Sequence, residues 1–215
     1  MRGGDATASG EAASVTSVAP RLHAALPGPL QVLSYDVHSW SSYSTGYHPR
    51  NILVDRPLDQ GSRWSSATNN PNQYLVVRLE KLSIVGTILF GKHHKNHVCN
   101  LREFKVFGGI TPDSMVELLH SGLRNDDEAE TFPLKTRIGG DFFPCQYIKI
   151  VPLLAWAQSF NYSIWFLQLR GIDDSAIVND GTHPPTAGSV LTFPSPQFVQ
   201  RVPRNGGHAP VPKVL

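Results

Sequence analysis

The chain has 215 residues and a net charge of +2 at pH 7, and its charged fraction of 17% is below the roughly 25% of an average soluble protein. So small a positive charge argues against nucleic-acid binding, which usually requires a clear basic stripe. The longest apolar run covers residues 151–157, whereas a membrane-spanning helix needs about 20 apolar residues. We therefore expect neither a nucleic-acid partner nor membrane insertion.

The cysteines and the first residues indicate the compartment. Cys99 and Cys145 are the only two cysteines, which is too few for a disulfide framework. The residues that follow Met1 lack the compact apolar segment of a secretory signal. Both observations favour a cytoplasmic protein.

Composition divides the chain into three parts. Residues 1–31 are rich in Ala, Gly, Ser and Pro without an apolar period, which predicts a disordered leader. Residues 32–178 contain every tryptophan and tyrosine of the chain, as expected for one folded domain. Residues 179–215 form a Pro-rich segment without strand or helix period, which predicts a disordered tail.

Apolar residues alternate with polar ones along the middle part, and no segment shows a sustained helical period. Alternation over four to eight residues is typical of half-buried strands. The predicted strands cover residues 73–79, 83–90, 146–151 and 163–171, with inward pairs at Phe104 and Val106 and at Val116 and Leu118. Within the four strands, the residues predicted to face inward are Leu75, Val77, Leu79, Ile84, Ile88, Phe90, Ile148, Ile150, Trp165, Leu167 and Leu169. Turn signals such as the Gly-Gly-Asp at 139–141 separate the strands. We therefore predict an all-β fold, an antiparallel β-sandwich of jelly-roll type.

Short motifs occur in a specific order along this domain. They are Ser41-Ser42, Asn51 with Asp55, Trp64-Ser65, Gln73-Tyr74-Leu75, Tyr147-Ile148-Lys149-Ile150 and Leu169-Arg170-Gly171. This order resembles the discoidin family (coagulation factor 5/8 type C), whose fold is galactose-binding-like. The segments 51–55, 62–66, 97–101, 104–109 and 149–156 are similar to the N-terminal discoidin domain of the muskelin-like family.

The resemblance implies a non-enzymatic intracellular adaptor module. Muskelin-like proteins are linked to cell spreading, to cytoskeletal responses to thrombospondin matrix and to a CTLH-type ubiquitin ligase. The implied partners are proteins: other muskelin-like chains through self-association, and ligase subunits if the missing domains are supplied. The LisH, CTLH and kelch regions of the family do not follow in this sequence, so we expect a truncated form. The disulfide that joins the ends of secreted discoidin domains is also absent.

In the discoidin family, loops at one end of the sandwich bind lipid, sugar or peptide. The matching loops cover residues 41–48, 62–72, 92–97 and 156–162. The candidate binding residues on and beside them are Tyr43, Tyr47, Arg63, His94, His97, Trp156, Phe160 and Tyr162. Two alternatives stay open: these aromatic side chains cap the core, or the domain binds a small ligand, a carbohydrate or a lipid headgroup.

The sequence gives little support for nucleotide binding, metal binding or catalysis. The spacing of Gly86, Gly91 and Lys92 fits a phosphate-binding loop, but the intervening residues form a predicted strand rather than a flexible loop. His93 and His97 lie near Cys99 without a carboxylate close in sequence, so we predict no metal site. Hydrolase motifs are absent, and we expect no catalytic residue and no cofactor. The acidic run at 126–130 has the pattern of a solvated loop without a specific role.

Overall fold

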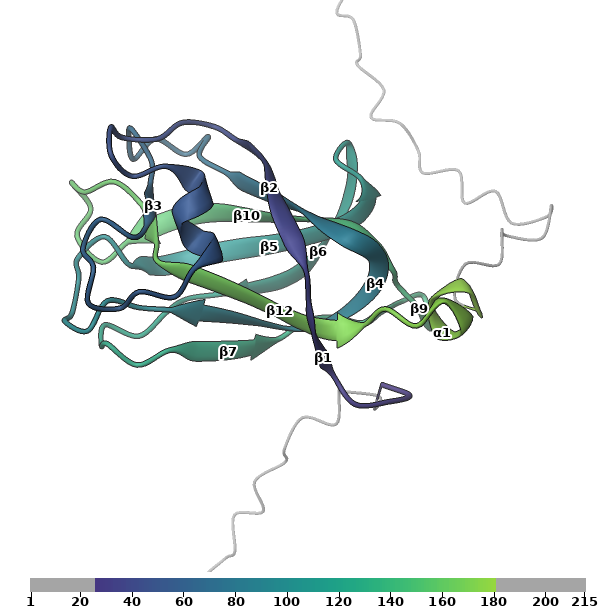
Figure 1. The fold of residues 1–215 in the computed structure, drawn as a ribbon. Helices are drawn as coiled ribbons and strands as arrows, with labels where there is room; N and C mark the ends of the chain where they lie inside the picture. Colours follow the sequence, from purple (N-terminus) through teal and green to yellow (C-terminus); the bar gives the residue numbers. More distant parts are fainter. Residues whose placement is uncertain (1–25, 181–215) are drawn as a thin grey trace, which may run out of the picture. The chain divides into compact units, whose positions relative to one another are not determined.

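The computed structural model describes residues 26–180 (Figure 1). The predicted leader 1–31 and tail 179–215 lie outside the described residues, apart from 26–31 and 179–180. The strands are β1 Gln31–Leu33, β2 Tyr35–Trp40, β3 Trp64–Ser65, β4 Leu75–Gly91, β5 Leu101–Thr111, β6 Ser114–Ser121, β7 Glu130–Pro133, β8 Arg137–Ile138, β9 Asp141–Phe142, β10 Cys145–Ala155, β11 Ser163–Ile164 and β12 Phe166–Ile172. Two short helices complete the described part, the 3-10 helix η1 Pro49–Leu53 and α1 Ser175–Asp180.

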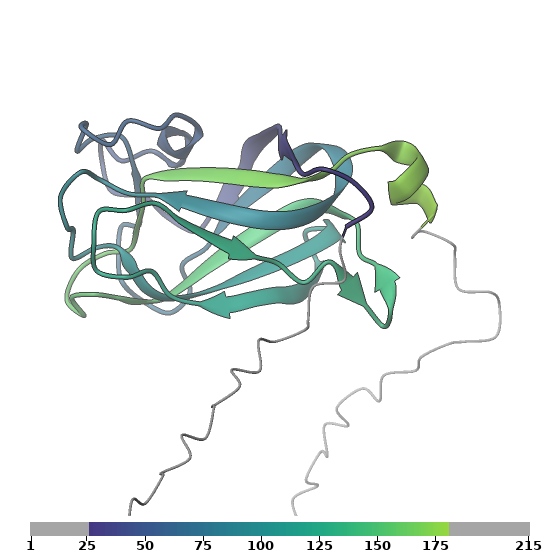
Figure 2. The ribbon, with the colours of Figure 1, turned by 90° about the horizontal axis from the view of Figure 1, so that it is seen from below.

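The long strands form two antiparallel layers, which Figure 2 shows one above the other. One layer has the order β2-β4-β10-β5-β6, and the other has the order β1-β12-β4-β7. Strand β4 belongs to both, because its first part pairs with β2 and β10 and its second part pairs with β7 and β12. This arrangement confirms the predicted jelly-roll sandwich.

The sequence predicted two strands, 73–79 and 83–90, where the structure has the single strand β4. The polar stretch between them, which includes exposed Glu80 and Lys81, is a bend in extended chain rather than a turn. The pairing with β10 changes register here, between Cys145 and Tyr147. A strand that bends in this way can leave one layer and enter the other.

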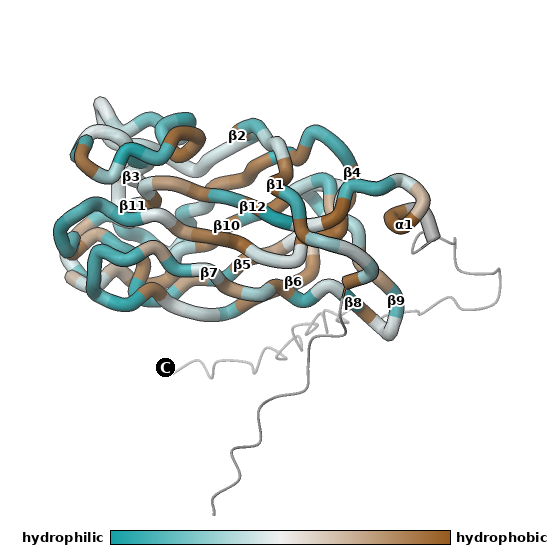
Figure 3. Tube along the Cα trace, turned by 60° about the horizontal axis from the view of Figure 1, so that its bottom comes forward, coloured by the Kyte–Doolittle hydropathy of each residue, from teal (hydrophilic) through white to brown (hydrophobic). Residues whose placement is uncertain are grey.

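The core lies between the layers and is made by the predicted inward faces. Its buried members include Leu75, Val77, Leu79, Ile84, Ile88, Phe90, Phe104, Val106, Ile148, Ile150, Leu167 and Leu169. Figure 3 shows hydrophobic residues along these strands and mostly hydrophilic residues in the loops at the β3 end. One predicted pair is wrong: Leu118 is buried, but Val116 is 39% exposed. The register of β6 against β5 shifts beside Leu118, so the two side chains no longer share a face.

Candidate binding site

One cavity at the loop end of the sandwich collects four of the predicted residues. Tyr47, Arg63, His97 and Phe160 line a cavity of about 390 Å³. The other lining residues are Ser44, Gln60, Ser65, Cys99, Ser159 and Asn161. The loops that carry them gather at the β3 end of the domain, on the left in Figure 1. We call this cavity the Arg63 pocket.

Backbone hydrogen bonds hold these loops together. The two-residue strand β3 pairs with β11, and the Ser66 N–H donates to the Tyr162 carbonyl at 3.0 Å. The Ser44 N–H donates to the Ser65 carbonyl at 2.8 Å, which attaches the 41–48 loop. Fully buried Trp64 donates its indole N–H to the Ser42 carbonyl at 2.9 Å. The loop end is therefore anchored to the core.

Arg63 is held in place from several sides. Its guanidinium carbon lies 3.9 Å from the ring centre of Tyr47 and 4.8 Å from that of Trp165. The Nη1 group donates to the carbonyl of Gln60, and the Asn51 amide donates to the Arg63 carbonyl at 3.1 Å. The residue is 6% exposed, and its Nε–H has no hydrogen-bond partner among the described residues. A buried donor without an acceptor is a costly arrangement.

Two histidines contact the same tryptophan. The rings of His93 and His97 lie 4.8 and 5.3 Å from the ring of Trp165. Burial lowers the pKa of both imidazoles, and the nearby Arg63 charge lowers both further, so they are neutral at pH 7. The Nδ1 of His97 accepts the Cys99 N–H at 3.4 Å, which assigns the proton of the neutral ring to Nε2. Within residues 26–180, no group of three or more His, Cys, Asp and Glu side chains has the arrangement of a metal site.

Two predicted residues belong to the scaffold around the pocket. Tyr162 is 4% exposed, and its hydroxyl lies within donating distance of the Asn69 and Leu153 carbonyls, at 3.0 and 3.1 Å. Burial raises the pKa of this phenol. Trp156 donates its indole N–H to the Leu123 carbonyl at 3.0 Å and carries Arg102 over its ring, outside the Arg63 pocket.

Two others lie beside the pocket rather than in it. Tyr43 is 42% exposed and packs edge-on against Trp40 and His48. The backbone N–H of His94 donates to the Pro57 carbonyl at 2.9 Å, and its ring Nδ1 lies 3.1 Å from the same oxygen. His94 therefore joins the 92–97 loop to the segment that follows η1.

Sequence reasoning missed Trp165 as a member of the site. The strand pattern correctly predicts that Trp165 is buried, but it does not predict contact with Arg63 and two histidines. Its indole N–H donates to the buried Asn100 side chain at 3.0 Å. No local sequence signal pairs residues this far apart along the chain.

The acidic run also differs from its prediction as a loop without a role. The Lys92 ammonium is fully buried and lies 2.6 Å from carboxylate oxygens of both Asp126 and Glu130. Arg124 binds the same two carboxylates from the solvent side. These contacts attach the acidic loop to the end of β4.

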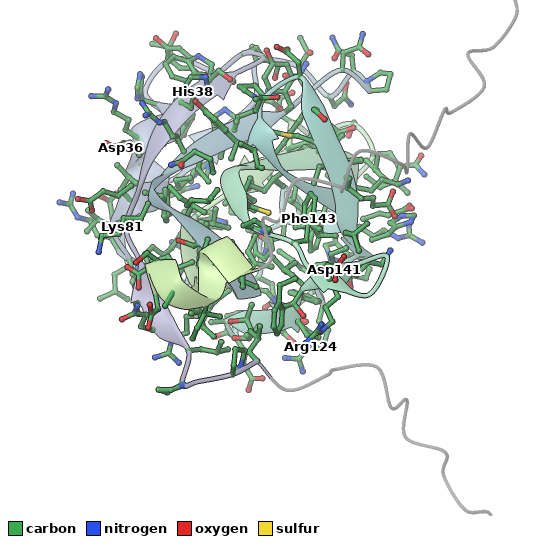
Figure 4. The ribbon with its side chains drawn as sticks, turned by 90° about the vertical axis from the view of Figure 1, so that its right-hand side faces the viewer. Asp36, His38, Lys81, Arg124, Asp141 and Phe143 are labelled. Carbon is green, nitrogen blue, oxygen red and sulfur yellow. The ribbon has the colours of Figure 1, made fainter. Side chains whose placement is uncertain are left out.

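A larger cavity, of about 630 Å³, lies elsewhere, over the outer edge of β2 and β4. Its lining residues include Asp36 and His38, which Figure 4 labels at the left and upper left of its view. Asp36 stands opposite Arg78 across the strand pair, so charges of both signs meet there. The cavity contains none of the predicted binding residues, and we favour the Arg63 pocket as the candidate site.

Comparison with known proteins decides the family. The family model described as the muskelin N-terminus matches residues 30–184. The chain belongs to the muskelin family. Mei4-dependent protein 6 of Schizosaccharomyces pombe is 47% identical over 156 residues, which cover 68% of this chain and 22% of that protein. The chain thus spans about a fifth of this relative's length.

Solved structures confirm the discoidin-like fold. CBM32-3 from a family 31 glycoside hydrolase of Clostridium perfringens matches with a TM-score of 0.54 and 12% identity, over 64% of this chain and 91% of that module. The family 32 CBM of Clostridium perfringens NanJ, solved in complex with galactose, matches with a TM-score of 0.51 and 14% identity, over 63% and 93%. At these identities the similarity concerns the fold alone. Some of the similar modules belong to enzymes, as the first of these two does. No helix among residues 26–180 has the length and apolar character to cross a membrane.

Proposed function

We propose that the domain is a non-enzymatic protein-interaction module of a muskelin-family adaptor, and that the Arg63 pocket and its rim form the binding surface. The observation that carries this proposal is an exposed aromatic side chain at the edge of the pocket. Phe160 is 48% exposed and lines the pocket together with the buried Arg63, and the loops at this end are anchored to the core. Half-exposed aromatic side chains and arginines are the usual anchors of protein interfaces. Loops on a rigid sandwich are a common place for such a surface.

The wider cellular role rests on family membership alone. It includes a cytoplasmic location, self-association with muskelin-like chains, and a link to cell spreading and to cytoskeletal responses to thrombospondin matrix. It also includes a link to a CTLH-type ubiquitin ligase when further domains are supplied. Support for these proposals is the match of the family model over residues 30–184.

Co-precipitation of the full 215-residue chain with a full-length muskelin-family protein and with a second, differently tagged copy tests the proposal. We expect capture to become at least about fivefold weaker in Phe160→Ala, because truncating an interface anchor costs about 1 kcal/mol or more. Ile110→Ala is the matched control, since Ile110 is similarly exposed, at 54%, but lies near the far end of β5. Capture that is equal for both variants would contradict a binding role for the loop end.

A second candidate function is binding of a carbohydrate or another small ligand. The polar side chains of Ser44 and Asn161 line the pocket together with Phe160, and sugars are commonly held by such groups next to an aromatic ring. A glycan array probed with the full chain tests this candidate. Glycan binding that survives Phe160→Ala, or no binding to any glycan, would contradict it.

A further inference from the structure

The Arg63 pocket has an uncompensated positive charge. Arg63 is the only formally charged residue among those that line it, and no lining residue is a carboxylate. None of the ion pairs among residues 26–180 includes Arg63. The residue is nevertheless more than nine-tenths buried, where an unpaired charge is costly. The site therefore favours a ligand that brings a negative charge.

Contacts within the chain occupy the face and one end of the Arg63 guanidinium, and the ligand would bind the remaining edge. The flat face of the guanidinium contacts the Tyr47 and Trp165 rings, and Nη1 is already bound to the Gln60 carbonyl. The Nε–H has no acceptor in the described part of the chain but is itself enclosed, so an anion in the cavity meets the guanidinium first at Nη2, the end that is not among the enclosed atoms. A guanidinium in this position is best satisfied by a planar anion that approaches its edge, and carboxylates have the matching shape.

Neighbouring groups add donors and an apolar contact. His97 is neutral with its proton on Nε2, so it can donate to an anion without a charge of its own. The Asn161 amide makes only two long hydrogen bonds, of 3.3 Å each, to Ser44 Oγ and to the Ala67 carbonyl. The half-exposed ring of Phe160 offers a surface to the residues that flank the anion. A cavity of about 390 Å³ also has room for more than a carboxylate group.

We propose that the Arg63 pocket recognises a carboxylate of a partner protein, with Arg63 as the group that binds it. The assignment rests on the proposed function and specifies the chemistry of the partner. A neutral sugar would leave the charge of Arg63 unpaired, which is why we favour an acidic protein segment. The carboxylate belongs either to an acidic side chain or to a free chain terminus, and the experiment distinguishes these two sources.

The test measures fluorescence anisotropy of short labelled peptides with the full 215-residue chain. The probes are an oligoglutamate peptide with an amidated terminus, its oligoglutamine counterpart, and a Gly-Ser peptide with a free terminal carboxylate. We expect binding of the first or the third probe, no binding of the oligoglutamine peptide, and weakening by salt. Binding of the oligoglutamine peptide as strong as that of the carboxylate probes, or no binding of either carboxylate probe, would overturn the proposal.

Two pairs of variants connect the binding to the pocket. Arg63→Met keeps the aliphatic stem and removes the charge, and we expect at least a tenfold loss of affinity. Arg137→Met is its matched control, since Arg137 also lies over an aromatic ring, that of Phe142, but in the β8–β9 hairpin. Unchanged affinity in Arg63→Met would contradict the assignment.

Because Arg63 is buried, a second pair of variants avoids a change in the core. Ser159 is exposed and lines the pocket, so Ser159→Glu supplies a carboxylate from the chain itself and should block the acidic probe. Ser159→Gln has the same size without the charge and should bind normally. Equal binding by these two variants would also overturn the proposal. Peptide binding that persists while the co-precipitation above fails would reject the protein-interaction role but keep the carboxylate site.

Discussion

At the scale of single residues, Lys92 has the strongest charge contacts of the described chain. Its fully buried ammonium lies 2.6 Å from both Asp126 and Glu130, and Glu130 is 13% exposed. We expect Lys92→Met to lower the free energy of unfolding by about 3 kcal/mol at pH 7, the low end of the range for breaking a buried pair. Lys105→Met removes a partly exposed pair with Glu117 and should cost clearly less, because water screens exposed ion pairs. Urea unfolding measures both values, and equal losses would contradict the role of Lys92.

The same contacts predict how acid changes stability. The hydrogen bond from Lys92 is the main reason that the pKa of Asp126 lies below its usual range. A carboxyl with a lowered pKa in the folded state stabilises the protein above its unfolded value of about 4, and this contribution disappears as the pH falls further. The stability difference between the parent chain and Lys92→Met should therefore narrow below about pH 4. A difference that stays constant from pH 6 to pH 2 would argue against this linkage.

At the scale of elements, the pairing of β12 with β4 depends on one close approach of the two backbones. Gly171 lies where the register shifts, and a Cβ atom placed on it would come 2.2 Å from the Ile84 carbonyl oxygen. We expect Gly171→Ala to destabilise the domain by about 2 kcal/mol, as overpacking does in other cores. Gly28→Ala is the control, because its Cβ would meet only the Ile172 side chain at 4.0 Å and should change stability by less than about 0.5 kcal/mol. Thermal melting of both variants checks this, and similar midpoints would contradict it.

At the scale of the whole molecule, the sandwich should unfold as one cooperative unit. Cys145 reports on this, because it lies in the core that both layers share and burial raises its pKa to about 12. Its thiolate is accessible only when the layers separate, so alkylation of Cys145 by iodoacetamide should follow global unfolding. Mass spectrometry of peptides after timed labelling in urea measures this rate. Fast labelling of Cys145 in the absence of denaturant would show that the layers open locally.

Local patterns predicted the elements better than their connections. Alternation placed Ile148, Ile150, Leu167 and Leu169 in the core, because a strand with one buried face must repeat every second residue. It could not show that 73–79 and 83–90 are one strand, since a bend without a turn leaves no Gly or Pro signal. The bulge that exposes Val116 depends on how β6 pairs with β5, and the sequence of β6 alone does not predict this pairing.

The candidate site combines residues that motif order selects with contacts that motif order does not predict. Four of the eight residues selected by the resemblance to the discoidin family, Tyr47, Arg63, His97 and Phe160, line one cavity. Trp156 and Tyr162 could not be separated from them, because burial of an aromatic residue depends on hydrogen-bond partners far away in the sequence. The contact of Trp165 with Arg63 joins residues far apart in the sequence and has no local signature.

The sequence by itself therefore determined the all-β class, the inward faces of the main strands, the muskelin family and the loops that form one end of the sandwich. These properties depend on local periodicity or on motif order, and both can be read along the chain. The tertiary structure decided which side chains meet: the arginine held against two rings, the neutral histidines beside it, and the lysine buried between two carboxylates. Charge, burial and hydrogen bonding at these places depend on residues brought together by strand pairing, so only the folded molecule specifies them.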